Sequence, residues 1–377
     1  MKLNSQQQLR IDILSKYLAG NLHYLDAMEL LKIRERQFRR QVKAFRQRGI
    51  ESVLHGNIGR KPVNKTCDHL KNKILTLYRG RYRGLNLIHF IEKLRFEEIN
   101  PVPCYGTIRN ILMEEKLISI KVKRRKRVHP MRKRYEKEGM MVQIDGSHHR
   151  WLHRQLPICL TLAMDDATGK LLSGTFTKTE TTFAAMDVVE KIIKEKGRFQ
   201  MLYSDRAGIY GGGKRDGYSQ MNTALKELEI LSIQANTPQA KGRVERMFRT
   251  LQSRLVHEFR LQNIQTLSEA NDYFNNVFIK EFNDQFAVEP VSSELAYRDF
   301  DNSIDLNEVF CLKETRTIAE GHVISYKGRK WILDLGREYN YAREQVEVRE
   351  YRDSSAKVFL KGREVEFEVF EEYKMAS

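Results

Sequence analysis

The order of apolar and amphipathic segments over residues 140–288 limits the fold more than any other feature of the sequence. An apolar run, MVQI, is followed by two further apolar runs joined by the turn DDATGK, which is the pattern of a β-hairpin. Next come an amphipathic helix (181–197), a strand (199–206), a helix (218–229), a short strand (ILSIQANTPQ) and a long helix from about Ala240. This order predicts an α/β core, a mixed sheet with helices on both faces.

Two helical units precede this core. In the first, residues 1–50, three apolar-periodic segments are closed by Gly49. The third segment places Phe38, Val42 and Phe45 on one face, because they lie at i, i+4 and i+7. Basic side chains are left for its outer face: Arg36, Arg39, Arg40, Lys43 and Arg46. Such a helix fits the major groove of DNA, as in a helix-turn-helix domain, although other three-helix bundles show a similar pattern.

A linker over 51–67 leads to a second helical unit, 68–120. The linker contains Gly-Arg-Lys-Pro, in which Arg60 and Lys61 resemble a minor-groove hook, but a plain interdomain connector fits these four residues equally well. Helical patterns follow, at 68–80, 85–95 and 103–117. Two tandem helix-turn-helix units would read a long DNA site.

The positive charge of the chain points to a polyanionic partner. The net charge is +17 over 377 residues, and the pI is near 9.6. The charge is densest in a basic arm, KVKRRKRVHPMRKRYEKEG, over 121–139. There Arg124, Arg125, Lys126 and Arg127 could follow a phosphate backbone; a solvated connector is the alternative.

The remaining composition favours a cytoplasmic protein. The four cysteines lie far apart and form no C-x-x-C pair, which argues against a disulfide framework or a structural zinc site. No window is apolar enough for a membrane span, and MKLNSQQQLRID lacks the apolar core of a signal peptide. We therefore expect no membrane partner.

Three carboxylates occupy matching positions in the predicted core. Asp145 ends the first strand before a Gly-Ser turn, and Asp205 ends the strand FQMLYSDR, so neighbouring strands would bring them side by side. Glu245 lies in the first turns of the long helix, at the edge of its buried stripe. For Asp145 alone, a turn-forming role is the alternative. For Glu245 the alternative is an ion pair with Lys241 and Arg249.

Three converging carboxylates without a buried cation would repel one another. A divalent metal relieves that repulsion, and oxygen-only ligands suit Mg²⁺ or Mn²⁺. The sequence therefore predicts a metal site made by Asp145, Asp205 and Glu245.

Three motifs give the core a family resemblance. The segments QIDGSHHRW, LYSDR and TPQAKGRVER, in this order, resemble the catalytic core of transposases in the retroviral-integrase superfamily, most closely the bacterial insertion-sequence transposases called ISNCY. The likeness is strong over 140–285 and extends over nearly the whole chain. It implies an RNase H-like fold with an Asp-Asp-Glu triad, matched by Asp145, Asp205 and Glu245. The chain departs from the retroviral pattern in lacking an N-terminal His/Cys zinc module.

The resemblance also implies a reaction. Two Mg²⁺ or Mn²⁺ ions per active site, about 3.5–4 Å apart, would activate a water or a DNA 3′-hydroxyl and stabilise the leaving oxygen. Such a site cleaves at the ends of the element and joins the freed 3′-OH to target DNA. The implied partners are the terminal inverted repeats, target DNA and at least one further subunit, in a bacterial cytoplasm near the nucleoid. A structure-specific nuclease and a DNA-binding regulator with an inactive core are the alternatives.

Further residues are expected near this site. Lys241 and Arg243 are predicted to contact DNA beside the scissile phosphate. His149 and Trp151 are predicted to shape the site or stack on DNA, because no cysteine nearby would complete a zinc site with the histidines.

The composition changes in the C-terminal segment, 289–377. Alternating strands with turns at Lys327-Gly328 and Lys361-Gly362 predict a small β-barrel, similar to the domain after the catalytic core of phage Mu transposase. Its expected role is contact with DNA or with another subunit.

Overall fold

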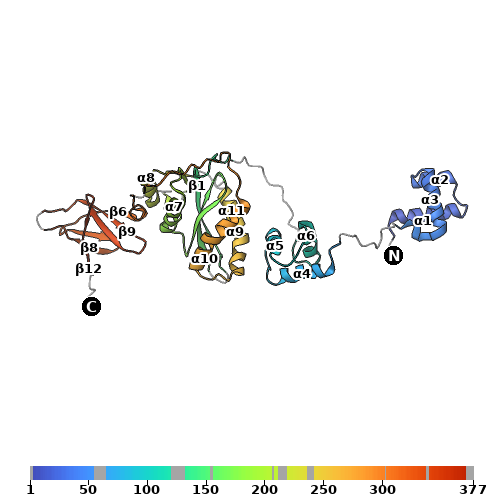
Figure 1. Cartoon of the computed structure of the whole chain (residues 1–377), viewed down its shortest axis with the longest axis horizontal. Coiled ribbons are helices and arrows are strands. Elements are labelled where there is room, and N and C mark those ends of the chain that lie inside the picture. Colours follow the sequence, from blue (N-terminus) through green and yellow to red (C-terminus); the bar gives the residue numbers. More distant parts are fainter. Residues whose placement is uncertain are drawn as a thin grey trace. The chain divides into compact units, whose positions relative to one another are not determined.

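The computed structural model describes most of the chain, as two compact units, Met1–Lys73 and Ile74–Ser377 (Figure 1). The described residues are 3–54, 65–119, 132–152, 156–205, 208–210, 219–235, 242–301, 303–336 and 339–370. Several predicted DNA contacts lie outside these ranges: Arg60, Lys61, Arg124, Arg125, Lys126, Arg127 and Lys241. Within the ranges, no helix has the length and apolar character needed to cross a membrane.

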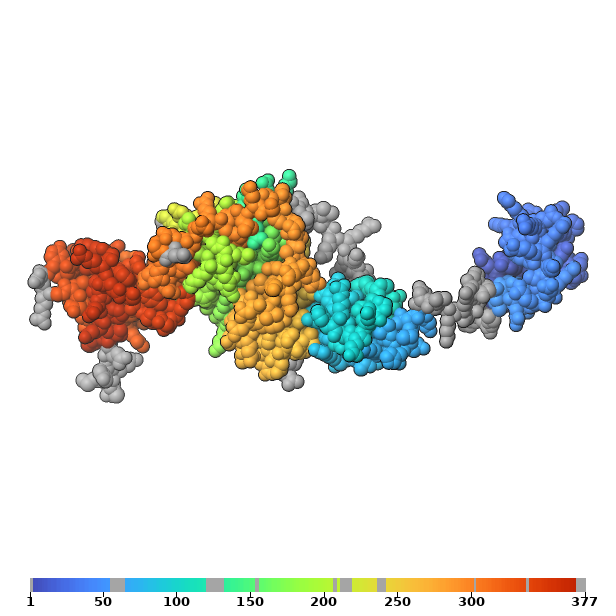
Figure 2. All heavy atoms as spheres, in the orientation of Figure 1, coloured from blue at the N-terminus to red at the C-terminus, as the bar shows by residue number. Residues whose placement is uncertain are grey.

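Near the N-terminus, in the part drawn dark blue in Figure 2, three helices pack around a small apolar core. They are α1 (Ser5–Leu18), α2 (Tyr24–Leu31) and α3 (Glu35–Arg48), followed by the short η1 (Gly49–Val53). Asn4 caps α1 in a capping box, and α3 ends before Gly49, whose φ is +56°. Phe38 and Val42 of α3 are buried, as their spacing predicts.

Three more helices follow, close to the predicted segments. They are α4 (Asp68–Arg79), α5 (Leu87–Leu94) and α6 (Tyr105–Glu114). The side chain of Asn86 caps α5 by accepting a hydrogen bond from the N–H of His89 at 2.9 Å. Phe90 and Leu112 are fully buried between these helices.

The core is built on a five-stranded mixed sheet, as the sequence predicts. Its strands are β1 (Met141–His149), β2 (Ile158–Asp165), β3 (Leu171–Thr177), β4 (Met201–Ser204) and β5 (Leu231–Gln234). Their order is β3-β2-β1-β4-β5. The first three pair antiparallel, and β4 and β5 run parallel to β1.

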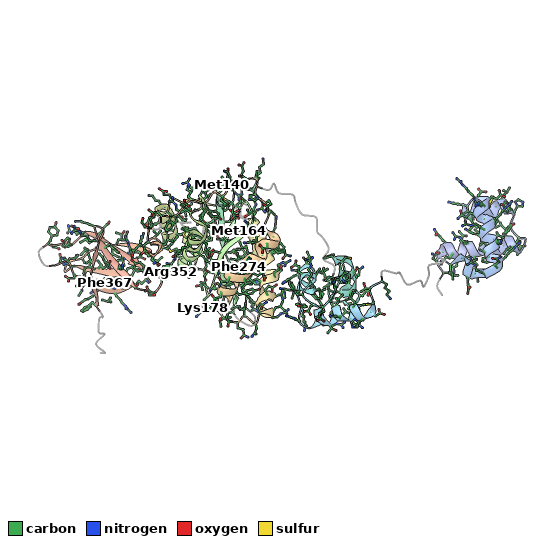
Figure 3. The ribbon with its side chains drawn as sticks, in the orientation of Figure 1. Met140, Met164, Lys178, Phe274, Arg352 and Phe367 are labelled. Carbon is green, nitrogen blue, oxygen red and sulfur yellow. The ribbon has the colours of Figure 1, made fainter. Side chains whose placement is uncertain are left out.

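Helices cover both faces of this sheet (Figure 1). One face, with Val142 and Ile144, packs against α7 (Thr182–Lys196) and α8 (Gln220–Glu227). The other packs against α9 (Gly242–Leu261), α10 (Leu267–Tyr273), the π-helical η4 (Phe274–Phe278) and α11 (Ile279–Phe286). Met164 and Phe274, labelled in Figure 3, belong to this second cluster.

Strand β1 is longer than predicted. We expected it to end at Asp145, but its antiparallel pairing with β2 continues through His149. Only the parallel pairing with β4 stops earlier, with Gln143 opposite Tyr203. Asp145 therefore lies two residues beyond the last pair between β1 and β4, and its hydrogen-bonded pairing with β2 keeps the strand extended.

The C-terminal domain differs from the predicted barrel. After α12 (Leu306–Val309), its strands are β6 (Leu312–Thr317), β7 (Val323–Tyr326), β8 (Arg329–Leu333), β9 (Gln345–Glu350), β10 (Ala356–Leu360), β11 (Arg363–Val365) and β12 (Phe367–Phe370). They form two sheets, β11-β10-β9-β6 and β12-β8-β7, over one core. In the part of the chain that the structure describes, no ladder joins the two sheets into a closed barrel.

The predicted turns of this domain are correct. Lys327-Gly328 and Lys361-Gly362 all have positive φ, between 48° and 80°, as two-residue hairpins require. Arg352, labelled in Figure 3, lies between β9 and β10 and pairs with Asp187 and Glu190 of α7. These ion pairs connect the C-terminal domain to the core.

Candidate active site

Asp145 and Asp205 occupy equivalent positions on adjacent parallel strands. The register of β1 and β4 pairs Gln143 with Tyr203. Asp145 follows Gln143 by two residues, and Asp205 follows Tyr203 by two residues. Because side chains alternate along a strand, Asp145 shares the face of Gln143. Its partner on β2 is Leu162, which packs in the cluster beneath α9. The two half-buried aspartates thus lie at the edge of the sheet where β4 ends, and Asp145 faces α9.

Two anchors fix α9 along this face of β1. At the start of the helix, Arg243 and Gln143 both donate hydrogen bonds to the carboxylate of Asp166. Further along, Gln252 Nε2 donates to Ser147 Oγ at 3.2 Å. The helical rise between Arg243 and Gln252, about 13 Å, matches the length of strand between Gln143 and Ser147, also about 13 Å. Helix and strand therefore run side by side in the same direction.

These two anchors place Glu245 on α9 at the level of Asp145 on β1. Glu245 follows Arg243 by two residues on α9, as Asp145 follows Gln143 on β1. Glu245 and Gln252 are seven positions apart, close to two helical turns, so they project from the same side of α9. The Glu245 side chain is exposed in the first turn of the helix.

A fourth carboxylate, which sequence reasoning missed, lies at the same edge. A Cβ added to Gly146 would meet Glu180 Oε1 at 2.7 Å, so the Glu180 carboxylate packs against the backbone directly after Asp145. The N–H of Gly146 donates to Asp145 Oδ1 at 3.0 Å. Glu180 precedes the N-cap of α7, Thr181, and only the tertiary fold brings it to β1.

These acids change the properties of two buried neighbours. Burial, followed by the charges of Glu180, Asp145 and Asp205, raises the pKa of Tyr210 well above its usual value. Burial and then the charge of Glu180 raise the pKa of Cys159 to about 11. Burial is the larger cause of both shifts, and the added effect of the carboxylate charges shows a negative potential at this place, which favours a bound cation.

The donor set fits a hard divalent cation, because Asp145, Asp205 and Glu245 offer only carboxylate oxygens. Among the residues that the structure describes, no three His, Cys, Asp or Glu side chains approach one another closely enough to hold a metal ion. Glu245 lies in the first turn of α9, just after the undescribed segment 236–241, whereas the two aspartates lie on or directly after strands of the sheet.

Arg243, which is predicted to contact DNA, forms an internal ion pair. Its guanidinium pairs with the buried Asp166 and donates to the carbonyl oxygen of Arg132, and its side chain is 20% exposed. The buried carboxylate of Asp166 needs such a cation inside the fold.

Trp151 is also a core residue. It is fully buried, its Nε1–H donates to the carbonyl oxygen of Ser147 at 3.1 Å, and its ring packs edge-on to Phe176. It cannot stack on DNA, although it supports the strand that carries Asp145. His149 packs edge-on to Trp151 with ring centroids 5.2 Å apart, and burial lowers its pKa.

The predicted basic face of α3 is exposed. Arg36, Arg39, Arg40 and Lys43 are all exposed on α3, whereas Phe38 is buried. Arg39 forms an ion pair with Glu35 one turn earlier on the same helix.

Comparisons with known proteins point to one family. A candidate transposase, y4bF, of Sinorhizobium fredii is 32% identical over 370 residues, covering 96% of this chain and 80% of that protein. The transposase for insertion sequence IS1202 of Streptococcus pneumoniae is 32% identical over 355 residues, covering 83% of this chain and 75% of that protein. No protein-family model matches the chain.

Two solved structures are among the matches. A chain of the simian T-cell lymphotropic virus intasome in complex with PP2A regulatory subunit B56 gamma is 14% identical, with a TM-score of 0.34; the match covers 78% of this chain and 98% of that chain. The HTLV-2 integrase catalytic core domain in complex with magnesium is 16% identical, with a TM-score of 0.32, and covers 42% of this chain and 94% of that chain. The family assignment rests on the two sequence relatives.

Proposed function

The chain belongs to the insertion-sequence transposases, and from this premise we propose that it binds the terminal inverted repeats of its element, cleaves the DNA at the element's ends and transfers the freed 3′-OH ends to target DNA. The observation that supports this proposal is the position of Asp145 and Asp205, each two residues beyond the paired Gln143 and Tyr203 on adjacent parallel strands. Glu245, in the first turn of α9, is proposed as the third member of an Asp-Asp-Glu triad.

The three carboxylates would hold Mg²⁺ or Mn²⁺, two ions in the proposed site. When bound, divalent ions lower the pKa of a water or hydroxyl nucleophile and neutralise charge on the leaving oxygen. The chain's own residues fix the geometry. The sheet supports Asp145 and Asp205 at the ends of adjacent strands, and α9, which carries Glu245, is anchored to β1 through Arg243 and Gln252.

We propose that the helical units, the linker and the basic arm contact DNA. The helices of 1–50 and 68–120 are proposed to act as tandem helix-turn-helix domains, in which the basic face of α3 reads the element ends. The linker at Arg60 and Lys61, the arm at Arg124–Arg127 and Lys241 are proposed to contact phosphates. The C-terminal domain is proposed to contact DNA or a second subunit.

The experiment is a Mg²⁺-dependent assay on DNA that carries the element ends. Asp145→Asn, Asp205→Asn and Glu245→Gln each remove a metal-binding charge and keep the side-chain shape, so each should abolish cleavage and strand transfer. Binding to end DNA should stay within about twofold of wild type, since the triad is not the recognition surface.

Two results would redirect this proposal. Cleavage without any joining of 3′-OH ends would favour a structure-specific nuclease. Retention of more than a few per cent of activity by any one of the three variants would remove that residue from the triad.

A further inference from the structure

Asp166 is a buried carboxylate with no part in the proposed reaction. Its side chain is 0% exposed and accepts hydrogen bonds from Arg132 Nη2 at 2.5 Å, from Gln143 Nε2 at 2.5 Å and from Arg243 Nη1. The backbone N–H of Tyr135 donates to its second oxygen at 3.1 Å. A buried charge is tolerated only with such partners, and together they fix the carboxylate in one place.

Two of these partners stand in the same relation to the proposed triad. Gln143 precedes Asp145 by two residues on β1, and Arg243 precedes Glu245 by two residues on α9. A single carboxylate oxygen of Asp166 therefore joins the strand that carries the first triad residue to the helix that carries the third.

The third link passes through Arg132. Its guanidinium lies over the ring of Tyr203, 5.4 Å from the centroid, and Tyr203 precedes Asp205 by two residues. The carbonyl oxygen of Arg132 also accepts a hydrogen bond from Arg243. The cluster of Asp166, Arg132 and Arg243 thus contacts Gln143 and Tyr203, which lie two positions before Asp145 and Asp205. It also contains Arg243, which lies two positions before Glu245.

We propose that Asp166 is a positioning residue, which sets the distances among Asp145, Asp205 and Glu245 through this cluster. This inference rests on the proposed function. Through Asp166, Arg243 anchors the first turn of α9, which carries Glu245, to Gln143 on the strand that carries Asp145. Displacing a reacting group by about 1 Å can cost a hundredfold in rate, so loss of the anchor should act on catalysis before it acts on folding.

Asp166→Asn is the direct test, because it keeps the side-chain shape and leaves two guanidiniums without their counter-charge. We expect the single-turnover rate of strand transfer, at saturating end DNA and Mg²⁺, to fall at least tenfold. The affinity for Mn²⁺, measured by EPR on the complex with end DNA that carries a 3′-deoxy terminus, should fall at least fivefold. Affinity for end DNA should change less than twofold, and all assays are run well below the melting temperature of the variant.

Glu294→Gln is the matched control. It removes the same charge from an ion pair with Lys137, in the same part of the fold, but on a side chain that is 73% exposed. It should leave the rate and the Mn²⁺ affinity within twofold of wild type. A purely structural role of Asp166 would instead lower the melting temperature and leave both quantities unchanged at temperatures where the variant is folded.

A second pair of variants decides the matter if Asp166→Asn does not fold. Arg243→Lys keeps the charge but loses the fork that reaches both Asp166 and the Arg132 carbonyl, and Arg243→Gln also loses the charge. The rate and the Mn²⁺ affinity should fall in the order wild type, Lys, Gln. Folded variants at position 166 or 243 that match wild type in both quantities overturn the inference. Activity in Asp145→Asn would instead overturn the proposed function.

Discussion

At the residue scale, the core shows how little space this fold leaves beside its aromatic cluster. A Cβ added to Gly174 on β3 would come within 2.5 Å of a ring carbon of Phe274 and 3.2 Å of a Leu160 methyl. Both are fully buried, and Phe274 also packs edge-on to Phe176, with ring centroids 5.7 Å apart. The absence of a side chain at Gly174 is therefore what allows η4 to lie on the sheet.

Gly174→Ala should destabilise the core by about 1–3 kcal/mol, because the ring must leave its favoured position. Chemical denaturation followed by tryptophan fluorescence measures the change. Gly106→Ala is the control, since Gly106 lies in α6 with open space around it and alanine favours a helix. Equal stability of Gly174→Ala and wild type would mean that η4 can shift without cost.

At the element scale, α5 is attached to α9 through buried charges. Glu258 of α9 accepts hydrogen bonds from His89 Nε2 at 2.6 Å and from Lys93 Nζ. Arg254 makes a two-pronged ion pair with Glu92, at 2.7 and 2.9 Å. Since α9 also carries Glu245, this contact connects the second helical unit, 68–120, directly to the helix of the proposed third triad residue.

The attachment of α5 should weaken in acid. Burial alone would raise the pKa of Glu258, but hydrogen bonds from His89 and Lys93 bring it below its usual value. For Glu92, likewise, burial is outweighed by Arg254. A carboxyl whose pKa is lowered by folding stabilises the fold above its unfolded pKa, about 4.3 for Glu, and loses that contribution as the pH falls through its folded value.

Hydrogen-exchange protection factors of α5 amides, compared between pH 6 and pH 3, measure this loss. Glu258→Gln should reduce protection at pH 6, by at most about 3 kcal/mol because Lys93 is partly exposed, and should flatten the pH dependence. Glu269→Gln on the exposed start of α10 serves as the control. Identical pH profiles for wild type and Glu258→Gln would contradict the assignment.

The basic face of α3 gives a second prediction at this scale. Arg40 is exposed on the side of α3 opposite Phe38. If it makes a bidentate contact to guanine, losing that contact should cost about 1–3 kcal/mol of discrimination between bases. Arg40→Gln in the full chain should reduce discrimination between end DNA and random DNA by that amount. Lys16→Gln on α1, whose side chain is 57% exposed and paired with Asp12, should not. Unchanged discrimination in Arg40→Gln would remove this residue from the reading face.

At the scale of the whole molecule, the proposed reaction needs two active sites, because two element ends join one target. We expect at least a dimer on DNA, whereas repulsion between surfaces of net charge +17 favours separate chains without it. Neutralising Arg124, Arg125, Lys126 and Arg127 together should weaken assembly. It should also flatten the salt dependence by about one unit of slope for each lost phosphate contact. Light scattering with and without end DNA, at several salt concentrations, measures both. An active complex with one subunit, or an unchanged slope, would contradict this prediction.

The sequence by itself determined the order of elements, the mixed sheet and the hairpin turns of the C-terminal domain. These follow from local periodicity and from glycine in turns, which act over a few residues. It also placed Asp145 and Asp205 on neighbouring strands.

What only the tertiary structure decided were the partners of charged groups and the closure of sheets. Arg243 pairs with Asp166, and Glu180 packs against Gly146, across separations in the chain that no periodicity encodes. In place of the predicted barrel the strands form two sheets, because pairing between strand edges depends on the twist and tilt of the packed strands. Burial makes an unpaired charge costly, and which partner relieves that cost is settled only when the elements pack together.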